Sequence, residues 1–430
     1  MNIPLEQPQS PDIYSFGFDG GLNRTLPNNS TGVVYDTLEQ ALNTGQVLSG
    51  GNLALKTLDV GSFTRSVSPG DNIQDAINAA SSRGGGRIVL RNGTYKLKTN
   101  LTMWSNVYLE GENAHTTILD FIDNASGIVA SGSNAYSTGS VTVSNNSTTV
   151  TGAGGTAWLT NVAAGQYILL GGIWYLIGAV TANDTIILGV PYGGTALSGA
   201  IYVTAIPIDD IKITRLLIKN ALTAIAVTYC SRLFFDDISI QSSVVGMSFT
   251  DSSLGTIAVP TLIACNSGVT LTRTHYTQIE GGAAIDVLAG NGFTMDTCTN
   301  LSFPNCVALN ASADGFNITS CSNINLNACS VVENAGQGIE FVSGNSDIVV
   351  LGGAMENNGS DGIRLTASTD NCQFIGNSIK DNGGYGINVA AATDDTNLLL
   401  GNNFATNTSG AVNNSGTGTL IRSNIGVADN

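Results

Sequence analysis

Charged residues are scarce in this sequence, and basic ones most of all. Only 11% of its 430 residues are charged, and 16 Lys and Arg face 32 Asp and Glu, which gives a net charge of −16. This acidity argues against binding to nucleic acid or to an anionic membrane surface. Disordered chains are typically rich in charge, whereas this one has 42% hydrophobic residues and 52 Gly. The composition favours long β-structure with tight turns.

Long apolar runs and metal-binding motifs are also missing. No apolar run reaches the ~20 residues that a transmembrane helix needs, so we expect no membrane insertion. The N-terminal Met1-Asn2-Ile3-Pro4 is not followed by a basic and then an apolar region, so no secretory signal is visible. Two His and no CxxC pair give no support to a His/Cys metal site. We therefore expect no cofactor and no metal.

Three consecutive stretches of 24 residues near the C-terminus repeat one pattern. They are Ser322–Asn345, Ser346–Thr369 and Asp370–Thr393. Within each stretch the apolar positions are two apart in short runs, which is strand periodicity. A fixed period of this length indicates a solenoid, in which each unit is one coil that stacks on its neighbours. The aligned apolar columns are Leu326/Val350/Phe374, Val331/Met355/Ile379, Ile339/Ile363/Ile387 and Phe341/Leu365/Val389.

Two polar columns and the cysteines follow the same repeat. Stacked Asn at a turn can pass amide hydrogen bonds from coil to coil, and Gly there would supply a positive φ. Seven cysteines cannot form a complete disulfide framework, and two pairs spaced 23 apart predict stacked buried thiols, with disulfides between coils as the alternative. The residues are Asn334, Asn358 and Asn382; Gly338, Gly362 and Gly386; and Cys298/Cys321 and Cys306/Cys329.

The first 137 residues divide into two parts. Residues 1–60, with several Pro and turn dipeptides, are either a disordered leader or an arm that anchors the protein to a larger assembly. In residues 61–137, Asn72–Ser82 predicts an amphipathic helix with an N-cap at Asp71 and a stop at the three Gly of 84–86. Such a helix would cover the apolar end of the first coil. Its apolar face is Ile73, Ala76, Ile77 and Ala80.

Residues 71–121, DNIQDAINAASSRGGGRIVLRNGTYKLKTNLTMWSNVYLEGENAHTTILDF, resemble the entry segment of the pectate-lyase-like superfamily. That group includes phage tailspikes, capsular depolymerases, pectinases and rhamnogalacturonases. The resemblance covers about 50 residues and implies an all-β fold, a right-handed parallel β-helix with an N-terminal capping helix. It does not select a chemistry.

Residues 138–205 interrupt the solenoid and resemble a small β-module that recurs in phage tail proteins. We expect five or six short strands with Trp158, Trp174, Tyr175 and Tyr192 as the core. In the alternative, Trp158, Trp174 and Tyr192 would be exposed and would stack on sugar rings. From residue 206 to 430 the coils resume, with a spacing of 22 in Ile211/Leu233, Ile213/Phe235, Ile218/Ile240, Ile225/Met247 and Val227/Phe249.

Catalytic residues are signalled only weakly. Residues 251–300 are the least regular stretch, and a site built from loops is expected there. Enzymes of the superfamily use paired carboxylates for hydrolysis, or Ca²⁺ with a basic residue for elimination. The candidates are Arg273, His275, Glu280 and Asp286, and the alternative is ordinary polarity of solvated loops. Glu340/Arg364 and Glu356/Lys380 are predicted cross-strand ion pairs.

One column favours association between copies of the chain. Leu351, Ile375 and Leu399 are predicted to point outward, one above another, where a soluble solenoid would usually be polar. We therefore interpret the chain as a homotrimeric, tailspike-like or tail-fibre-like virion protein for attachment to host-surface glycans, extracellular after release. Its N-terminal arm would join other tail proteins. The alternatives are a polysaccharide depolymerase on the same β-helix, either a glycoside hydrolase or a lyase, and a secreted carbohydrate-active enzyme.

Overall fold

The computed structural model describes residues 26–27, 34–35, 63–123 and 125–427. In the N-terminal unit, β1 (Leu26–Pro27) pairs with β2 (Val34–Tyr35) in antiparallel fashion. The rest of the predicted arm over residues 1–60 lies outside the described residues. No helix in the described part of the chain is both long and apolar enough to cross a membrane.

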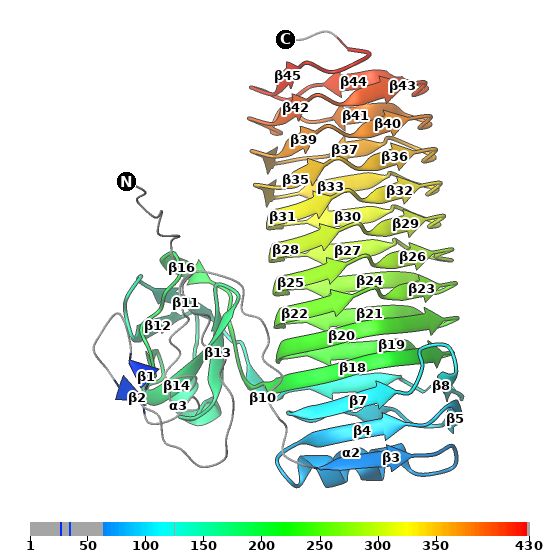
Figure 1. The fold of residues 1–430 in the computed structure, drawn as a ribbon. Helices are drawn as coiled ribbons and strands as arrows, with labels where there is room; N and C mark the ends of the chain where they lie inside the picture. The colour runs from blue at the N-terminus through cyan, green and yellow to red at the C-terminus, as the bar shows by residue number, and fades with distance from the viewer. Residues whose placement is uncertain (1–25, 28–33, 36–62, 124, 428–430) are drawn as a thin grey trace, which may run out of the picture. The chain divides into compact units, whose positions relative to one another are not determined.

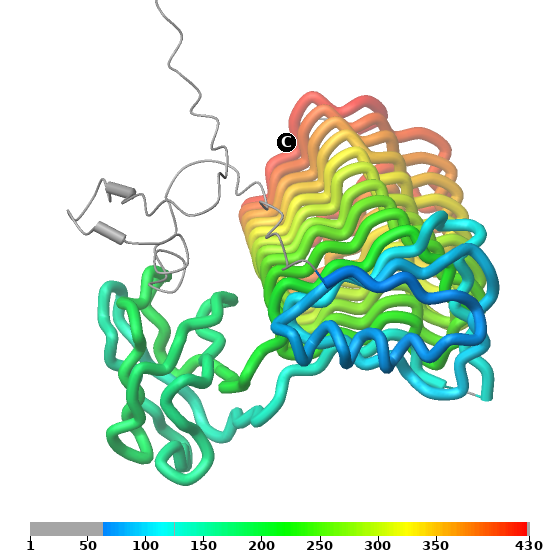
Figure 2. The backbone as a smooth tube through the Cα atoms, turned by 60° about the horizontal axis from the view of Figure 1, so that its bottom comes forward, coloured from blue at the N-terminus to red at the C-terminus, as the bar shows by residue number. Residues whose placement is uncertain are grey.

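The second unit contains a right-handed parallel β-helix, as predicted (Figure 1). Every strand of the solenoid pairs in parallel with the strand one coil away, and Figure 2 shows successive coils following nearly the same path. From residue 253 onward a coil has three short strands separated by corners. In the two coils before it, the first and second strands are continuous, as β18 (Ile208–Lys219) and β20 (Cys230–Gln241).

The three strands of a coil form three stacks. The first stack contains β3 (Thr64–Val67), β4 (Gly86–Leu90), β7 (Val107–Gly111), β22 (Ser253–Ala258), β25 (His275–Glu280), β28 (Thr299–Pro304), β31 (Ser322–Asn327), β35 (Val349–Leu351), β39 (Gln373–Ile375), β42 (Leu398–Leu400) and β45 (Leu420–Arg422), with the short β34 (Asn345–Ser346) and β38 (Thr369–Asp370) before β35 and β39. The second contains β5 (Gly93–Leu97), β8 (Thr117–Phe121), β23 (Thr261–Ile263), β26 (Ala283–Ile285), β29 (Val307–Leu309), β32 (Ser330–Val332), β36 (Ala354–Glu356), β40 (Ser378–Lys380) and β43 (Asn403–Ala405).

The third stack is a separate sheet of 11 strands. It contains β6 (Leu101–Thr102), β9 (Ile128–Ser131), β19 (Thr223–Thr228), β21 (Val245–Thr250), β24 (Ser267–Thr272), β27 (Phe293–Asp296), β30 (Phe316–Thr319), β33 (Ile339–Ser343), β37 (Ile363–Leu365), β41 (Tyr385–Val389) and β44 (Gly410–Asn414).

The helix α2 (Ile73–Ser81) covers the N-terminal end of the solenoid, beside β3 and β4. Its four predicted apolar residues are buried, which confirms the predicted face. The predicted cap is wrong by one residue: Asn72 Oδ1 accepts from the Asp75 N–H at 3.2 Å, while Asp71 accepts from the Ser68 N–H at 2.9 Å. Gly84 and Gly85 have positive φ and end the helix.

The predicted core columns are confirmed. The four 24-residue apolar columns and the five 22-residue pairs all lie in register on neighbouring strands, with their side chains buried. Asn334 Nδ2 donates to Asn358 Oδ1 and Asn358 Nδ2 to Asn382 Oδ1, each at 2.9 Å, so the predicted amide ladder is also present. All seven cysteines are buried free thiols, and the Cys298 N–H donates to Cys321 Sγ at 3.3 Å.

The role predicted for the glycine column is wrong. Gly338, Gly362 and Gly386 do not have positive φ. They are required because the coils approach closely: a Cβ on Gly338 would lie 2.4 Å from the Gly362 carbonyl oxygen. Stacking distance rather than turn geometry therefore explains the glycine at this position.

The inserted module lies between β9 and β18 in sequence, and β18 resumes parallel pairing with β7 and β8. It is an eight-stranded antiparallel sheet with a short helix, α3 (Trp158–Asn161), and its own core. Trp158 is fully buried at its centre and donates from Nε1 to the Tyr202 hydroxyl at 2.8 Å. In sheet order the strands are β10 (Ser133–Tyr136), β17 (Val203–Ile206), β13 (Tyr167–Leu170), β14 (Ile173–Ala182), β15 (Thr185–Leu188), β12 (Thr149–Ala153), β11 (Ser140–Val143) and β16 (Leu197–Ala200).

Candidate functional site

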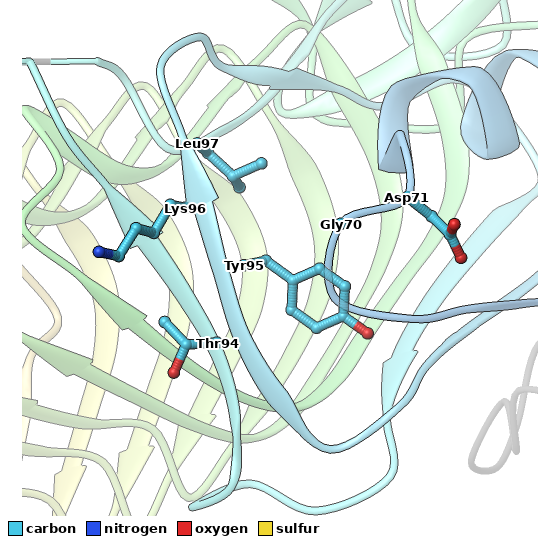
Figure 3. A pocket seen from close by; sticks show the side chains of 6 residues that line it. All are labelled: Gly70, Asp71, Thr94, Tyr95, Lys96 and Leu97. Atoms are coloured by element: carbon cyan, nitrogen blue, oxygen red, sulfur yellow. The ribbon is translucent and has the colours of Figure 1, made fainter.

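A small hollow near the N-terminal end of the solenoid is lined by residues that stabilise the first coil. Figure 3 shows it between the segment just before α2, at Gly70 and Asp71, and strand β5, at Thr94–Leu97. The Tyr95 hydroxyl donates to the Val67 carbonyl at 2.7 Å, and burial raises the pKa of Tyr95 to about 12. Because its main polar groups hold the backbone of the first coil, this hollow is not a candidate for chemistry.

The four predicted catalytic residues are not brought together. His275 begins β25 and Glu280 ends it, so roughly 16 Å of extended strand separates them. Asp286 lies beyond the next strand, at another corner, and is exposed. Residues 251–300 form regular three-stranded coils, so the expected loop-built site is also wrong.

These residues have structural partners instead, and Asp286 Oδ1 accepts from Asn310 Nδ2 on the neighbouring coil at 2.7 Å. Arg273 donates from Nε and Nη2 to the two carboxylate oxygens of Asp251, at 2.7 and 2.8 Å. His275 Nδ1 lies 2.8 Å from the Thr299 hydroxyl, and burial lowers its pKa to about 4, so the ring is neutral at pH 7. A neutral, buried imidazole and a guanidinium held in a bidentate pair are suited to joining coils.

The outer face of the 11-stranded sheet carries two continuous polar columns. Residues on both columns alternate with buried core residues along each strand, so their side chains point outward. Neighbours in a column are about 4.8 Å apart, the spacing of paired strands. The first column is Ser248, Thr270, Thr294, Asn317, Glu340, Arg364, Asn388 and Asn413; the second is Thr228, Thr250, Thr272, Asp296, Thr319 and Ser343.

This face was missed at the sequence level, although its signal is present. The core columns Ile225/Met247 and Val227/Phe249 were identified, and a hydroxyl residue directly follows Val227, Met247 and Phe249 in sequence, whereas Ala226 follows Ile225. A Ser or Thr beside a core residue is unremarkable in one strand. Only its recurrence in register over successive coils marks a surface.

A pair of carboxylates lies on this face. Asn317 Nδ2 donates to Asp314 Oδ2 and to Glu340 Oε2, at 3.1 Å each, which places the two oxygens within about 6 Å of one another. Partial burial and the nearby Asp314 carboxylate raise the pKa of Glu340, while Arg364 opposes that shift. A raised pKa suits a group that donates a proton.

Glu340 and Arg364 are in register, as predicted. Glu340 also accepts from the Thr366 hydroxyl at 3.4 Å. Of the two predicted cross-strand ion pairs, only Glu356/Lys380 is confirmed, with Lys380 Nζ 3.2 Å from Glu356 Oε1; Glu340 and Arg364 are in register but form no ion pair within 4.0 Å. Both pairs lie on the outside of the coils, where an ion pair contributes at most about 1 kcal/mol.

Two of the three aromatic residues considered for sugar stacking are unavailable. Trp158 and Tyr192 are buried in the core of the module, and the Tyr192 hydroxyl donates to the Thr195 carbonyl at 2.9 Å. A small sheet requires large aromatic side chains to fill its core, which explains their position. Of the three residues, only Trp174, which is half-buried, is still predicted to stack on a sugar ring.

The outward apolar column differs from the prediction at one position. Val350, Phe374 and Leu399 form the inward column, and Leu399 is fully buried. The coil between β39 and β42 has 25 residues, one more than its predecessor, so Leu400 rather than Leu399 continues Leu351 and Ile375. A second outward apolar column, on the second stack of strands, was missed; it is Ile263, Ile285, Leu309 and Val332, all half-buried.

Comparison with known proteins agrees with this architecture. Residues 199–354 match a family model described as "Right handed beta helix region". The A-module of mannuronan C-5 epimerase AlgE4 from Azotobacter vinelandii is similar in structure, with a TM-score of 0.50 at 16% identity over 81% of this chain and 94% of that one. The tailspike protein gp49 from Pseudomonas phage LKA1 gives a TM-score of 0.53 at 14% identity over 82% and 74%. No curated protein matches the sequence.

Proposed function

We propose that this right-handed parallel β-helix is a tailspike-type virion protein that holds host-surface polysaccharide on the outer face of its 11-stranded sheet. The observation that carries the proposal is the pair of outward columns of hydroxyl and amide side chains. These groups both donate and accept hydrogen bonds, as sugar hydroxyls do. Their repeat of about 4.8 Å suits a periodic, extended ligand. The fold shared with a tailspike and with an epimerase of mannuronan supports the same interpretation.

The proposal includes assembly into a homotrimer. Two outward columns are apolar over several coils: Leu351, Ile375 and Leu400 form one, and Ile263, Ile285, Leu309 and Val332 form the other. Fully burying an aliphatic side chain contributes roughly 1.5–3 kcal/mol, so several of them in each protomer offset part of the cost of association. Residues 1–60 would anchor the trimer to other tail proteins, and the solenoid would then lie outside the particle.

Hydroxyl deletion on the sheet tests the binding face. Thr270 and Thr272 lie side by side on β24 and point outward, so Thr270→Val with Thr272→Val removes two hydroxyls from the centre of the face. At about 1 kcal/mol for each lost hydrogen bond, affinity should fall roughly thirtyfold. The probe is a printed array of bacterial capsular and O-antigen polysaccharides.

The matched control is Thr256→Val, which changes an outward threonine on β22, in the first stack. It should bind as the wild type does. Equal losses in both variants would contradict a binding site on the 11-stranded sheet, and so would a double variant with unchanged affinity.

Hydrolysis of the bound polysaccharide is a second candidate function, favoured by the Asp314–Glu340 pair. Glu340 could donate a proton to a glycosidic oxygen, while Asp314 could act as nucleophile or base. If so, Glu340→Gln stops the release of reducing ends but leaves binding intact. Glu280→Gln, at the exposed residue predicted from sequence, is the matched control and should retain activity. Equal activity in both variants would exclude this role for Glu340.

A further inference from the structure

We infer that the polysaccharide held on this face is built from uncharged sugars, without uronate, sialate or phosphate groups. The inference rests on the proposed function and specifies its ligand class. Its first support is the composition of the face. Of the fourteen residues in the two columns, eleven are hydroxyl or amide side chains, and the charged ones are Asp296, Glu340 and Arg364.

The one cation of the two columns lies among carboxylates. Arg364 is in register with Glu340 on the neighbouring strand, and its charge opposes the rise in the pKa of Glu340 that burial and Asp314 cause. Beside this pair, the buried carboxylate of Asp361 accepts from the Tyr385 N–H at 2.6 Å and from Asn388 Nδ2 at 2.8 Å. An acidic sugar at Arg364 would therefore meet two carboxylates as well as one guanidinium.

The surrounding coils make the field more negative. Residues 274–427 contain thirteen Asp and Glu against three Lys and Arg. One of the three, Lys380, is paired with Glu356 at 3.2 Å. The Debye length at physiological ionic strength is about 8 Å, longer than the spacing of about 4.8 Å between coils. An anionic polymer lying along the columns would thus be repelled by several coils at once.

An uncharged polysaccharide avoids this repulsion and loses nothing in hydrogen bonding. The outward hydroxyls on β21 and β24 donate and accept without requiring a charged partner. Hydrogen bonds between neutral groups are also only weakly screened by salt. Binding to an uncharged polysaccharide should therefore be nearly independent of ionic strength, whereas binding to an acidic one would depend strongly on it.

The test compares neutral and acidic polysaccharides on one printed array at 20, 150 and 500 mM NaCl. The expected hits are neutral polysaccharides, with affinities that change less than twofold across the series. Tightest binding to acidic polysaccharides, weakening as salt rises, would overturn the inference and leave the proposed function standing. Binding to no polysaccharide at any salt concentration would overturn the proposed function and the inference with it.

A charge reversal on the face provides a second readout. Asp296→Lys should create binding to acidic polysaccharides at 20 mM NaCl. Asp286→Lys changes the net charge equally but at a corner outside the columns, and it should not create such binding. Equal gains in both variants would assign the effect to net charge instead of to this face, and would overturn the inference.

Discussion

The buried amide ladder gives the sharpest prediction about what holds the coils together. Asn358 is almost fully buried and joins three coils. Its Oδ1 accepts from the backbone N–H of Asn334 at 3.2 Å and from Asn334 Nδ2 at 2.9 Å, and its Nδ2 donates to Asn382 Oδ1 at 2.9 Å. Asn358→Ala removes all of these hydrogen bonds and leaves the Asn334 backbone N–H without this acceptor.

An unsatisfied buried donor costs about 1–3 kcal/mol, and each lost hydrogen bond contributes about 1 kcal/mol more. We therefore expect Asn358→Ala to lower the free energy of unfolding by roughly 3–5 kcal/mol. The midpoint of urea unfolding, followed by circular dichroism, measures the change. Asn327→Ala, at an exposed position of β31, is the control and should stay within about 0.5 kcal/mol of the wild type. If both variants unfold at the same midpoint, the ladder does not stabilise the coils.

Three further predictions address the core, the assembly and the pH dependence. Ile363→Asp places an unpaired carboxylate in a fully buried column and should abolish soluble folding; near wild-type melting would contradict the core register. Leu351→Lys with Ile375→Lys should convert a trimer into monomers, as measured by light scattering, with unchanged circular dichroism. A wild-type protein that is already monomeric would refute a trimer contact through Leu351 and Ile375. Burial raises the pKa of Asp209 to about 6 and lowers that of His275 from 6.5 to about 4, so their contributions to stability oppose each other as pH rises. Asp209→Asn removes the contribution of Asp209 and keeps that of His275. The urea midpoint of this variant should therefore rise between about pH 4 and 6.5, and a midpoint that falls over this range contradicts the lowered pKa of His275.

The fold was largely predictable because one physical rule generates it. Side chains alternate at a period of two within strands, and from residue 208 onward the strands recur every 22–25 residues, so core columns can be read from sequence alone. The prediction failed where the sequence does not mark the register. Leu398, Leu399 and Leu400 are identical side chains, and a coil one residue longer moves Leu399 from the outside to the core without changing the local pattern.

The candidate site was less predictable, for a different reason. Arg273, His275, Glu280 and Asp286 are close in sequence, but corners and extended strand separate them around one coil. The residues that do share a face are about 22–25 positions apart, and most are ordinary threonines and asparagines. Their significance depends on the register and on which strands share a sheet, and only the structure supplies both. The same holds for Trp158, because aromatic content alone does not separate a core residue from an exposed one.

The most direct test of the central claim is the structure of the protein in complex with an oligosaccharide from a polysaccharide that it binds. We expect density for the sugar along the outer face of the 11-stranded sheet, with its hydroxyls within hydrogen-bond distance of Thr250, Thr270, Thr272 and Asn317. Density on the first or second stack of strands, or on the inserted module, with this face empty, would contradict it.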